Sequence, residues 1–144
     1  MQPLPLRLRR SSKKAAAQDD GLIPFESVYV ASNVTDTAAT INAKLDQGLH
    51  VVVSGGIYQI EEPLRLHTEG QVLLGIGMAT LISAAGNSVI DVADVHGVRV
   101  AGLLIDAGES DTTHLVKWGE EGSKGDHHNP GVISDVFVRS FLPS

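Results

Sequence analysis

The chain has 144 residues, a formal net charge of -6 and 42% hydrophobic residues, which is ordinary for one globular domain. It contains no cysteine, so a disulfide scaffold, a thiolate metal site and a cysteine nucleophile are excluded. Aromatic residues make up only 4% while glycine occurs 15 times, so we expect an aliphatic core with glycines at tight corners. This composition favours stacked short strands.

The basic residues are concentrated at the start of the chain. Five of the eleven lie in the first fourteen positions: Arg7, Arg9, Arg10, Lys13 and Lys14. The acidic remainder argues against nucleic acid as a partner, because phosphate contacts need clustered Lys and Arg. We predict that residues 1–22 form a disordered basic tail, with a transit peptide as the alternative; prolines interrupt any signal-peptide core. No later run is apolar and long enough to span a membrane.

Residues 23–144 are predicted to form one domain that begins with a strand at residues 25–31. A helix is expected over residues 37–47, with Thr35 or Asp36 as its N-cap and Gly48 at its end. Strands follow at residues 50–54 and 57–60, and the run 71–82 predicts strand, glycine corner and strand. Glycine corners directly between strands suit a chain that turns through a coil better than a hairpin.

The run 89–106 predicts strands at residues 89–92, 98–100 and 103–105. Four apolar side chains are expected to point inward as core residues: Val98, Val100, Leu103 and Ile105. The outward positions are Asp91, Arg99 and Asp106. The pattern recurs at residues 133–138, which can be laid over residues 100–105 at an offset of 33 positions (133 minus 100). Such a repeat predicts a solenoid of strands.

Residues 107–130 form a long acidic loop that only a short strand at residues 114–118 interrupts. Connections of this length are usually either functional or disordered. A strand at residues 132–139 follows, with no polar capping helix after it. Because an uncapped coil exposes a sheet end that invites aggregation, we expect the chain to be part of a longer protein.

Residues 36–60 resemble the first coil of pectin lyase-like right-handed parallel β-helix proteins, where a short helix precedes a strand-Gly-x-Tyr segment, here Gly56, Ile57 and Tyr58. GIGMATLI, at residues 75–82, resembles the Gly-x-Gly-x-x-Thr corner of their next coil. Residues 93–108 are similar to a bacterial and fungal group related to glycoside hydrolase family 55, the exo-β-1,3-glucanase-like enzymes. Some of that group are labelled adenylyl cyclase, but no paired-metal nucleotide motif is present here.

The resemblance implies an all-β fold: a right-handed, single-stranded parallel β-helix with a short N-terminal capping helix, here an incomplete solenoid. It also implies the N-terminal part of a carbohydrate-active protein, hydrolase-like or lyase-like, with a polysaccharide such as a β-glucan as partner and an extracellular location. Catalytic residues in such enzymes lie on later coils, so those of this chain are unknown and the piece is expected to be inactive. The alternative is a non-enzymatic binding or assembly module of the spike or adhesin type. The oligomeric state stays open.

Four residues are candidates for contact with a sugar: Asp91, Arg99, Asp106 and Trp118. Carboxylates on successive coils can line a sugar groove, and glycosidic cleavage needs two of them roughly 5 to 10 Å apart. The single tryptophan offers an aromatic face for stacking on a sugar ring. The alternatives are a turn role for Asp106, at the end of its strand, and simple packing for Trp118.

Asp126, His127 and His128 are the densest ionisable cluster, and imidazole with carboxylate oxygen can hold a divalent cation. Adjacent histidines point apart unless the backbone constrains them, so a solvated loop is the alternative. Otherwise no cofactor is expected. The Gly75 to Thr80 run lacks the third glycine and the following helix of a dinucleotide site, and is interpreted as a structural corner.

Overall fold

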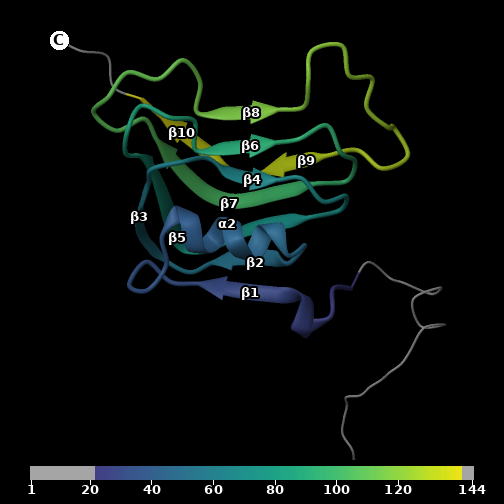
Figure 1. The fold of residues 1–144 in the computed structure, drawn as a ribbon, viewed down its shortest axis with the longest axis horizontal. Helices are drawn as coiled ribbons and strands as arrows, with labels where there is room; N and C mark the ends of the chain where they lie inside the picture. The colour runs from purple at the N-terminus through teal and green to yellow at the C-terminus, as the bar shows by residue number, and fades with distance from the viewer. Residues whose placement is uncertain (1–21, 141–144) are drawn as a thin grey trace, which may run out of the picture.

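A computed structural model describes residues 22–140 of the protein. The tail predicted at residues 1–22 lies outside the described residues, apart from Leu22. The described chain forms two parallel sheets that face each other across a common core (Figure 1). The first sheet contains β1 (Val28–Ala31), β2 (His50–Val53), β3 (Gly56–Ile60), β5 (Val72–Ser83), β7 (Arg99–Asp106), β9 (Val132–Ser134) and β10 (Phe137–Arg139). The second contains β4 (Leu64–Leu66), β6 (Ile90–Val92) and β8 (Val116–Trp118).

The chain passes from one sheet to the other and back, so that each turn lies on the preceding one. Val51 pairs with Leu73, Leu73 with Val100 and Val100 with Ile133, all in parallel register. The pairing of Val100 with Ile133 confirms the repeat offset of 33 positions (133 minus 100). The fold is therefore a parallel β-solenoid, as the sequence predicts.

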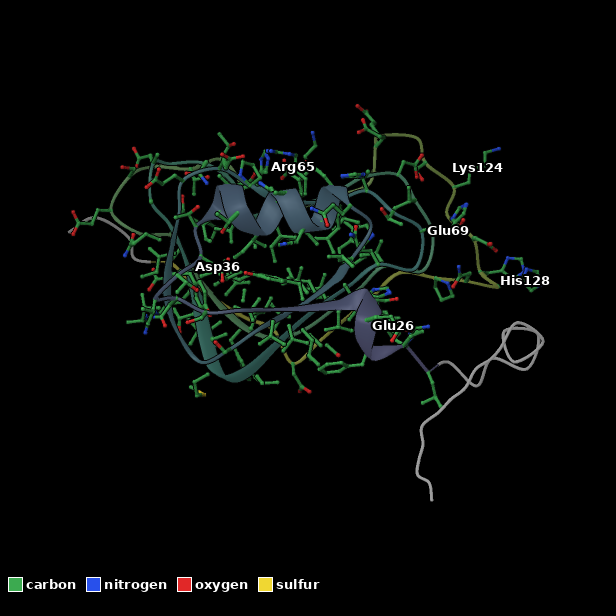
Figure 2. All side chains as sticks on the ribbon, turned by 60° about the horizontal axis from the view of Figure 1, so that its bottom comes forward. Glu26, Asp36, Arg65, Glu69, Lys124 and His128 are labelled. Atoms are coloured by element: carbon green, nitrogen blue, oxygen red, sulfur yellow. The ribbon has the colours of Figure 1, made fainter. Side chains whose placement is uncertain are left out.

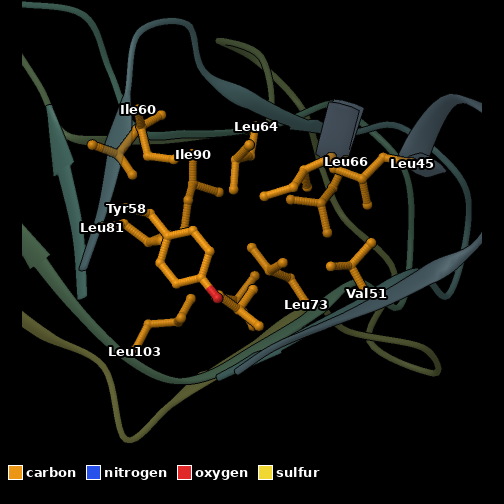
Figure 3. Close-up of a cluster of buried hydrophobic side chains, with 14 of the residues drawn as sticks. Leu45, Val51, Tyr58, Ile60, Leu64, Leu66, Leu73, Leu81, Ile90 and Leu103 are labelled. Atoms are coloured by element: carbon orange, nitrogen blue, oxygen red, sulfur yellow. The ribbon is translucent and has the colours of Figure 1, made fainter. Parts of the chain in front are cut away.

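Aligned apolar residues form ladders that fill the space between the two sheets (Figure 3). Residues paired in parallel register point to the same side, so a buried residue on one turn lies over a buried residue on the next. Tyr58, Leu81 and Ile105 form one such ladder, and Leu64 and Ile90 form another. The four side chains predicted to point inward are all buried: Val98, Val100, Leu103 and Ile105.

Glycine corners bend the strands of the first sheet without ending them. The predicted strands within residues 71–82 are one bent strand, β5, and those at residues 98–100 and 103–105 are one strand, β7. In β5 the register shifts between Leu74 and Ala79, where Gly77 has φ 66°. In β7 the bend lies at Gly102, with φ 75°. Hydrogen bonds to the neighbouring strand resume beyond each corner, which is why the strands continue.

The helix α2 (Ala38–Asp46) begins later than either predicted cap position. Its N-cap is Thr37, whose Oγ1 accepts from the Thr40 N–H, while the Thr40 side chain accepts from the Thr37 N–H. The predicted cap Asp36 instead accepts hydrogen bonds from the Tyr29 hydroxyl and the Ser32 N–H. The predicted stop is confirmed, because Gly48 follows the helix with φ 82°.

The helix covers the free edge of β4, and one side chain takes over the hydrogen bonds that a neighbouring strand would make. Asn42 is buried; its Oδ1 accepts from the Arg65 N–H at 2.9 Å, and its Nδ2 donates to the Pro63 carbonyl at 2.9 Å. The strand β4 itself was not predicted. The predicted strand at residues 25–31 starts only at Val28, after the 3-10 turn η2 (Phe25–Ser27).

The last described turn is the least covered. The single strand predicted at residues 132–139 is divided into β9 and β10 by Asp135, with φ 51°. Ile133 and Val138 continue the core ladders but are 49% and 57% exposed, and Phe137 is 70% exposed. No described strand lies over them. None of the helical segments in residues 22–140 could span a bilayer.

Candidate functional site

The four predicted sugar-contacting residues do not gather at one place. Asp91 lies on β6, on the outer face of the second sheet, where its register partners are Arg65 on β4 and Lys117 on β8. Its Oδ1 accepts a hydrogen bond of 2.7 Å from the Ser88 hydroxyl. Oppositely charged register neighbours stabilise a sheet surface, so the surroundings of Asp91 fit a structural role.

Arg99 and Asp106 lie at opposite ends of β7. Arg99 is exposed, as predicted. Asp106 lies on the outer face as predicted, since it follows the inward Ile105 and is in register with the exposed Arg139. It is nevertheless buried, because its Oδ2 accepts from Arg139 Nη2 at 2.6 Å and Nε at 3.1 Å. The hydrogen bond with Arg139, together with the Gly108 N–H bond, lowers the pKa of Asp106. The ion pair ties β10 to β7, and the Gly108 contact is that of a residue ending its strand.

Trp118 occupies an inward position on β8, in register with Leu66 and Val92. Those two partners are buried, whereas Trp118 is 39% exposed. On its other side the indole lies against Gly131, where an added Cβ would come within 2.6 Å of Cζ2. The ring therefore covers the end of a core ladder and keeps part of its surface open to solvent.

The loops that follow β6 and β8 enclose a hollow of about 310 Å³ beside this ring, called here the Trp118 hollow. Its polar lining includes Asp94, His96, Glu120, Ser123, Asp126 and Asn129. The two loops are joined by a hydrogen bond of 2.5 Å from the Ser123 hydroxyl to Asp94 and by one of 2.8 Å from the Gly119 N–H to the Val92 carbonyl. The hollow unites two candidates, Trp118 and Asp126, that lie apart in the sequence.

Asp94 and His96 are not among the site residues predicted from the sequence. A usable signal was present, because loops that leave adjacent parallel strands on the same side emerge at one edge of the sheet. Once β6 and β8 are known to be neighbours, residues 93–97 and 119–131 must lie together. The pairing of β6 with β8 could not be predicted from the sequence, because each strand has only three residues.

The predicted metal cluster is brought together by a tight turn. One donor atom from each of Asp126, His127 and His128 lies within 4.8 Å of the others, and the two imidazole centroids are 4.0 Å apart. The His128 N–H donates to Asp126 Oδ1 at 2.9 Å. This hydrogen bond is a backbone constraint of the kind that adjacent histidines need in order to lie together. Figure 2 shows His128 on the loop that also carries Lys124, projecting from the body of the solenoid.

Comparison with known proteins places this architecture in a family. The model of the LAM55 pectate lyase-like domain matches residues 28–142. The chain belongs to this family. The LAM55-type chain is 44% identical over 118 residues to an exo-β-1,3-glucanase from Streptomyces sp. (strain SirexAA-E / ActE), a match that covers 81% of the chain and 19% of that enzyme.

Two solved structures resemble this LAM55-type chain over the same share of its length. SacteLam55A from Streptomyces sp. SirexAA-E superposes with a TM-score of 0.75 at 44% identity, covering 81% of this chain and 21% of that protein. A variant of sacteLam55A in complex with glucose gives 0.73 at 42% identity. The chain thus spans about a fifth of the length of these relatives. The resemblance to glucanase-like β-helix proteins is confirmed for the family and the fold.

The carboxyl groups with displaced pKa values in the described LAM55-type solenoid are all held in the ionised form. Besides Asp106, the pKa of Asp36 is lowered by hydrogen bonds from Ser32, Tyr29 and Thr40 against the opposing effect of burial. The pKa of Glu62 is lowered by hydrogen bonds from Arg65 and Asn42. The general acid of a glycosidase needs the opposite displacement, toward a raised pKa. These three carboxylates serve the fold.

Proposed function

We propose that this chain supplies the N-terminal solenoid turns of a glucanase-like, carbohydrate-active protein and does not itself hold the catalytic centre. One observation carries the proposal: residues 28–142 match the LAM55 pectate lyase-like domain, while the similarity reaches over only 19% of an exo-β-1,3-glucanase. The lowered pKa values of Asp36, Glu62 and Asp106 support it, because none of these groups is suited to donate a proton to a leaving sugar.

The transcript offers the first test of this proposal. If it extends beyond codon 144, we expect further solenoid turns that contain paired Asp or Glu residues. The rival function, a non-enzymatic binding or assembly module, is favoured by the exposed apolar residues of β9 and β10. A stop codon at that point, together with a monomeric product that has no affinity for glucan, would contradict the first proposal.

We infer that a β-1,3-glucan is the polysaccharide partner and that the Trp118 hollow is where this chain touches it. The inference is supported by the part-exposed indole, whose face can pack on the C–H face of a sugar ring. It is supported further by the hydroxyl, amide and carboxylate groups of Ser123, Asn129 and Asp94 around it, which can pair with sugar hydroxyls. The extracellular location predicted from the resemblance belongs to the same proposal, and secretion into the culture medium is its test.

The glucan contact can be measured through the tryptophan itself, since Trp118 is the only one in the chain. Titration with a β-1,3-gluco-oligosaccharide is expected to change its emission saturably, whereas a β-1,4-linked oligosaccharide of the same length should have a weaker effect. In calorimetry, Trp118→Leu should abolish the heat of binding. The matched control is Phe25→Leu, which alters an 83% exposed aromatic ring at the other end of the solenoid. If both variants bind the oligosaccharide equally well, the Trp118 hollow is not the contact site.

A further inference from the structure

The loop that leaves β8 carries a group of side chains that the glucan proposal does not use. We propose that Asp126, His127 and His128 form a binding site for a divalent transition-metal cation, with Zn²⁺ as the reference ion. The proposal goes beyond the function proposed above and does not depend on it. It starts from the observation that a carboxylate oxygen and two imidazole nitrogens already lie within 4.8 Å of one another.

The donor atoms of these three residues are available to an ion. The described residues offer no hydrogen-bond partner to the ring nitrogens of His127 or to Asp126 Oδ2; Oδ1 accepts the His128 N–H and lies 3.7 Å from His128 Nδ1. The two histidine side chains are exposed and their rings contact each other, so the core does not oppose their rotation. In a tetrahedral zinc site with bonds of roughly 2.0 to 2.2 Å, neighbouring donor atoms are about 3.4 Å apart. A change of side-chain torsion can bring the present donor atoms, which lie within 4.8 Å of one another, to that separation.

The ligand types select the class of cation. Two imidazole nitrogens and one carboxylate oxygen suit Zn²⁺, Ni²⁺ and Cu²⁺, whereas Ca²⁺ and Mg²⁺ prefer all-oxygen sites. Three protein donors leave a fourth position to water or to a donor from a ligand. A site of this kind is open rather than a closed structural one.

The electrostatic surroundings favour a cation at this place. Asp126 also lines the Trp118 hollow, where Asp94 and Glu120 add negative charge and Lys124 supplies the only Lys or Arg side chain among the lining residues. Like-charged carboxylates around a small hollow raise the local concentration of cations. A cation bound at Asp126 would restrain residues 119–131 next to Trp118, so the indole can report its binding.

The experiment uses the full chain without an affinity tag, titrated with ZnCl₂ in a calorimeter. We expect one Zn²⁺ per chain, with the affinity reduced at least roughly tenfold in His127→Ala and in His128→Ala, because each removes one of three ligands. The matched control is His114→Ala, which removes an exposed histidine outside the cluster and should bind as the parent does. Equal affinities for all three variants, or no heat with the parent, would overturn the site.

A second measurement keeps the result independent of protein stability. Cu²⁺ quenches a nearby indole, so we expect addition of CuCl₂ to the parent chain to reduce Trp118 emission saturably. His128→Ala should shift that curve to higher Cu²⁺ concentration, while circular dichroism shows the same fold as the parent. Unchanged quenching in a folded His128→Ala chain would show that the ion binds elsewhere and would refute the proposal.

Discussion

Single buried amides hold the ends of the solenoid turns where strand pairing is missing. Asn42 satisfies Arg65 and Pro63 at the edge of β4. Gln71, fully buried, accepts from the His67 and Thr68 N–H groups and donates to the Leu45 and Leu49 carbonyls. A buried backbone group without a partner costs free energy comparable to a lost hydrogen bond. These side chains therefore act as short substitutes for a strand.

We predict that Asn42→Leu lowers the free energy of unfolding by about 1 to 3 kcal/mol, because it leaves the Arg65 N–H unpaired and removes one of the two hydrogen bonds to the Pro63 carbonyl. Urea denaturation followed by circular dichroism measures the change. The control is Gln47→Leu, which removes an exposed amide at the end of the same helix and should change the stability by less than about 0.5 kcal/mol. If Asn42→Leu lowers the free energy of unfolding no more than the control does, Asn42 does not replace the hydrogen bonds of a neighbouring strand.

His50 makes the stability depend on pH. Its Nδ1 accepts the Val72 N–H at 3.0 Å, which requires a ring nitrogen without a proton, and burial lowers the pKa of the ring below its usual value. The folded state thus binds a proton less readily than the unfolded state. We predict that stability is highest above the unfolded pKa of about 6.5 and falls as the pH drops from there toward the folded pKa. Urea midpoints between about pH 8 and pH 5 should fall less in His50→Gln than in the parent.

At the scale of the element, glycine corners allow adjacent turns to approach each other. Gly102 in β7 has φ 75° and faces Gly75 in β5, so a Cβ at Gly102 would clash with the Gly75 carbonyl oxygen. Gly119 has φ 74°, but nothing lies within 4 Å of the place its Cβ would take. Comparing substitutions at Gly102 and Gly119 therefore distinguishes the cost of the positive φ from the cost of the close contact between turns.

Gly119→Ala is therefore predicted to cost only the conformational strain, about 1 to 2 kcal/mol. Gly102→Ala adds the backbone clash and should cost at least about 2 kcal/mol more, because β5 and β7 must separate. Thermal unfolding of the two variants beside the parent measures both effects. Equal losses would mean that the two turns are not in contact at this corner.

The strands and corners could largely be predicted from the sequence, because alternation and glycine spacing are local signals. The strand β4 was missed because Leu64–Leu66 is too short to show alternation. The cap was misplaced because Asp36 and Thr37 are both suitable cap residues, and the hydrogen bonds that Asp36 accepts from Tyr29 and Ser32 are not visible in the sequence. The burial of the outward Asp106 could not be predicted, because its partner, Arg139, lies 33 positions (139 minus 106) further along the chain.

At the scale of the molecule, the exposed face of β9 and β10 is the expected site of self-association. Phe137, Val138 and Ile133 are 70%, 57% and 49% exposed, and the described residues place no strand beyond them. A sheet end with apolar side chains and unpaired backbone groups promotes pairing with another chain.

We predict that Phe137→Lys reduces concentration-dependent association of the isolated chain, because a charge on this face opposes stacking. Sedimentation velocity at several concentrations measures the effect. Ile76→Lys, at a 49% exposed position on the interior strand β5, is the control and should associate as the parent does. If both variants associate equally, the contact lies elsewhere on the molecule.

The site was harder to predict than the fold, because it depends on which loops become neighbours. Asp126, His127 and His128 are adjacent in the sequence and could be found there, whereas the approach of Asp94 to Ser123 follows from the pairing of β6 with β8. Trp118 was found by its chemistry, but its inward register over Val92 appears only in the assembled solenoid.

We have proposed that these solenoid turns belong to a glucan-processing protein and lack its catalytic centre. The most direct test is the release of glucose from a β-1,3-glucan by the purified, folded chain, measured beside an active exo-β-1,3-glucanase. We expect no release above that of the boiled chain, even at high protein concentration. Glucose release by the folded chain that is lost in Asp91→Asn or Asp106→Asn would contradict it.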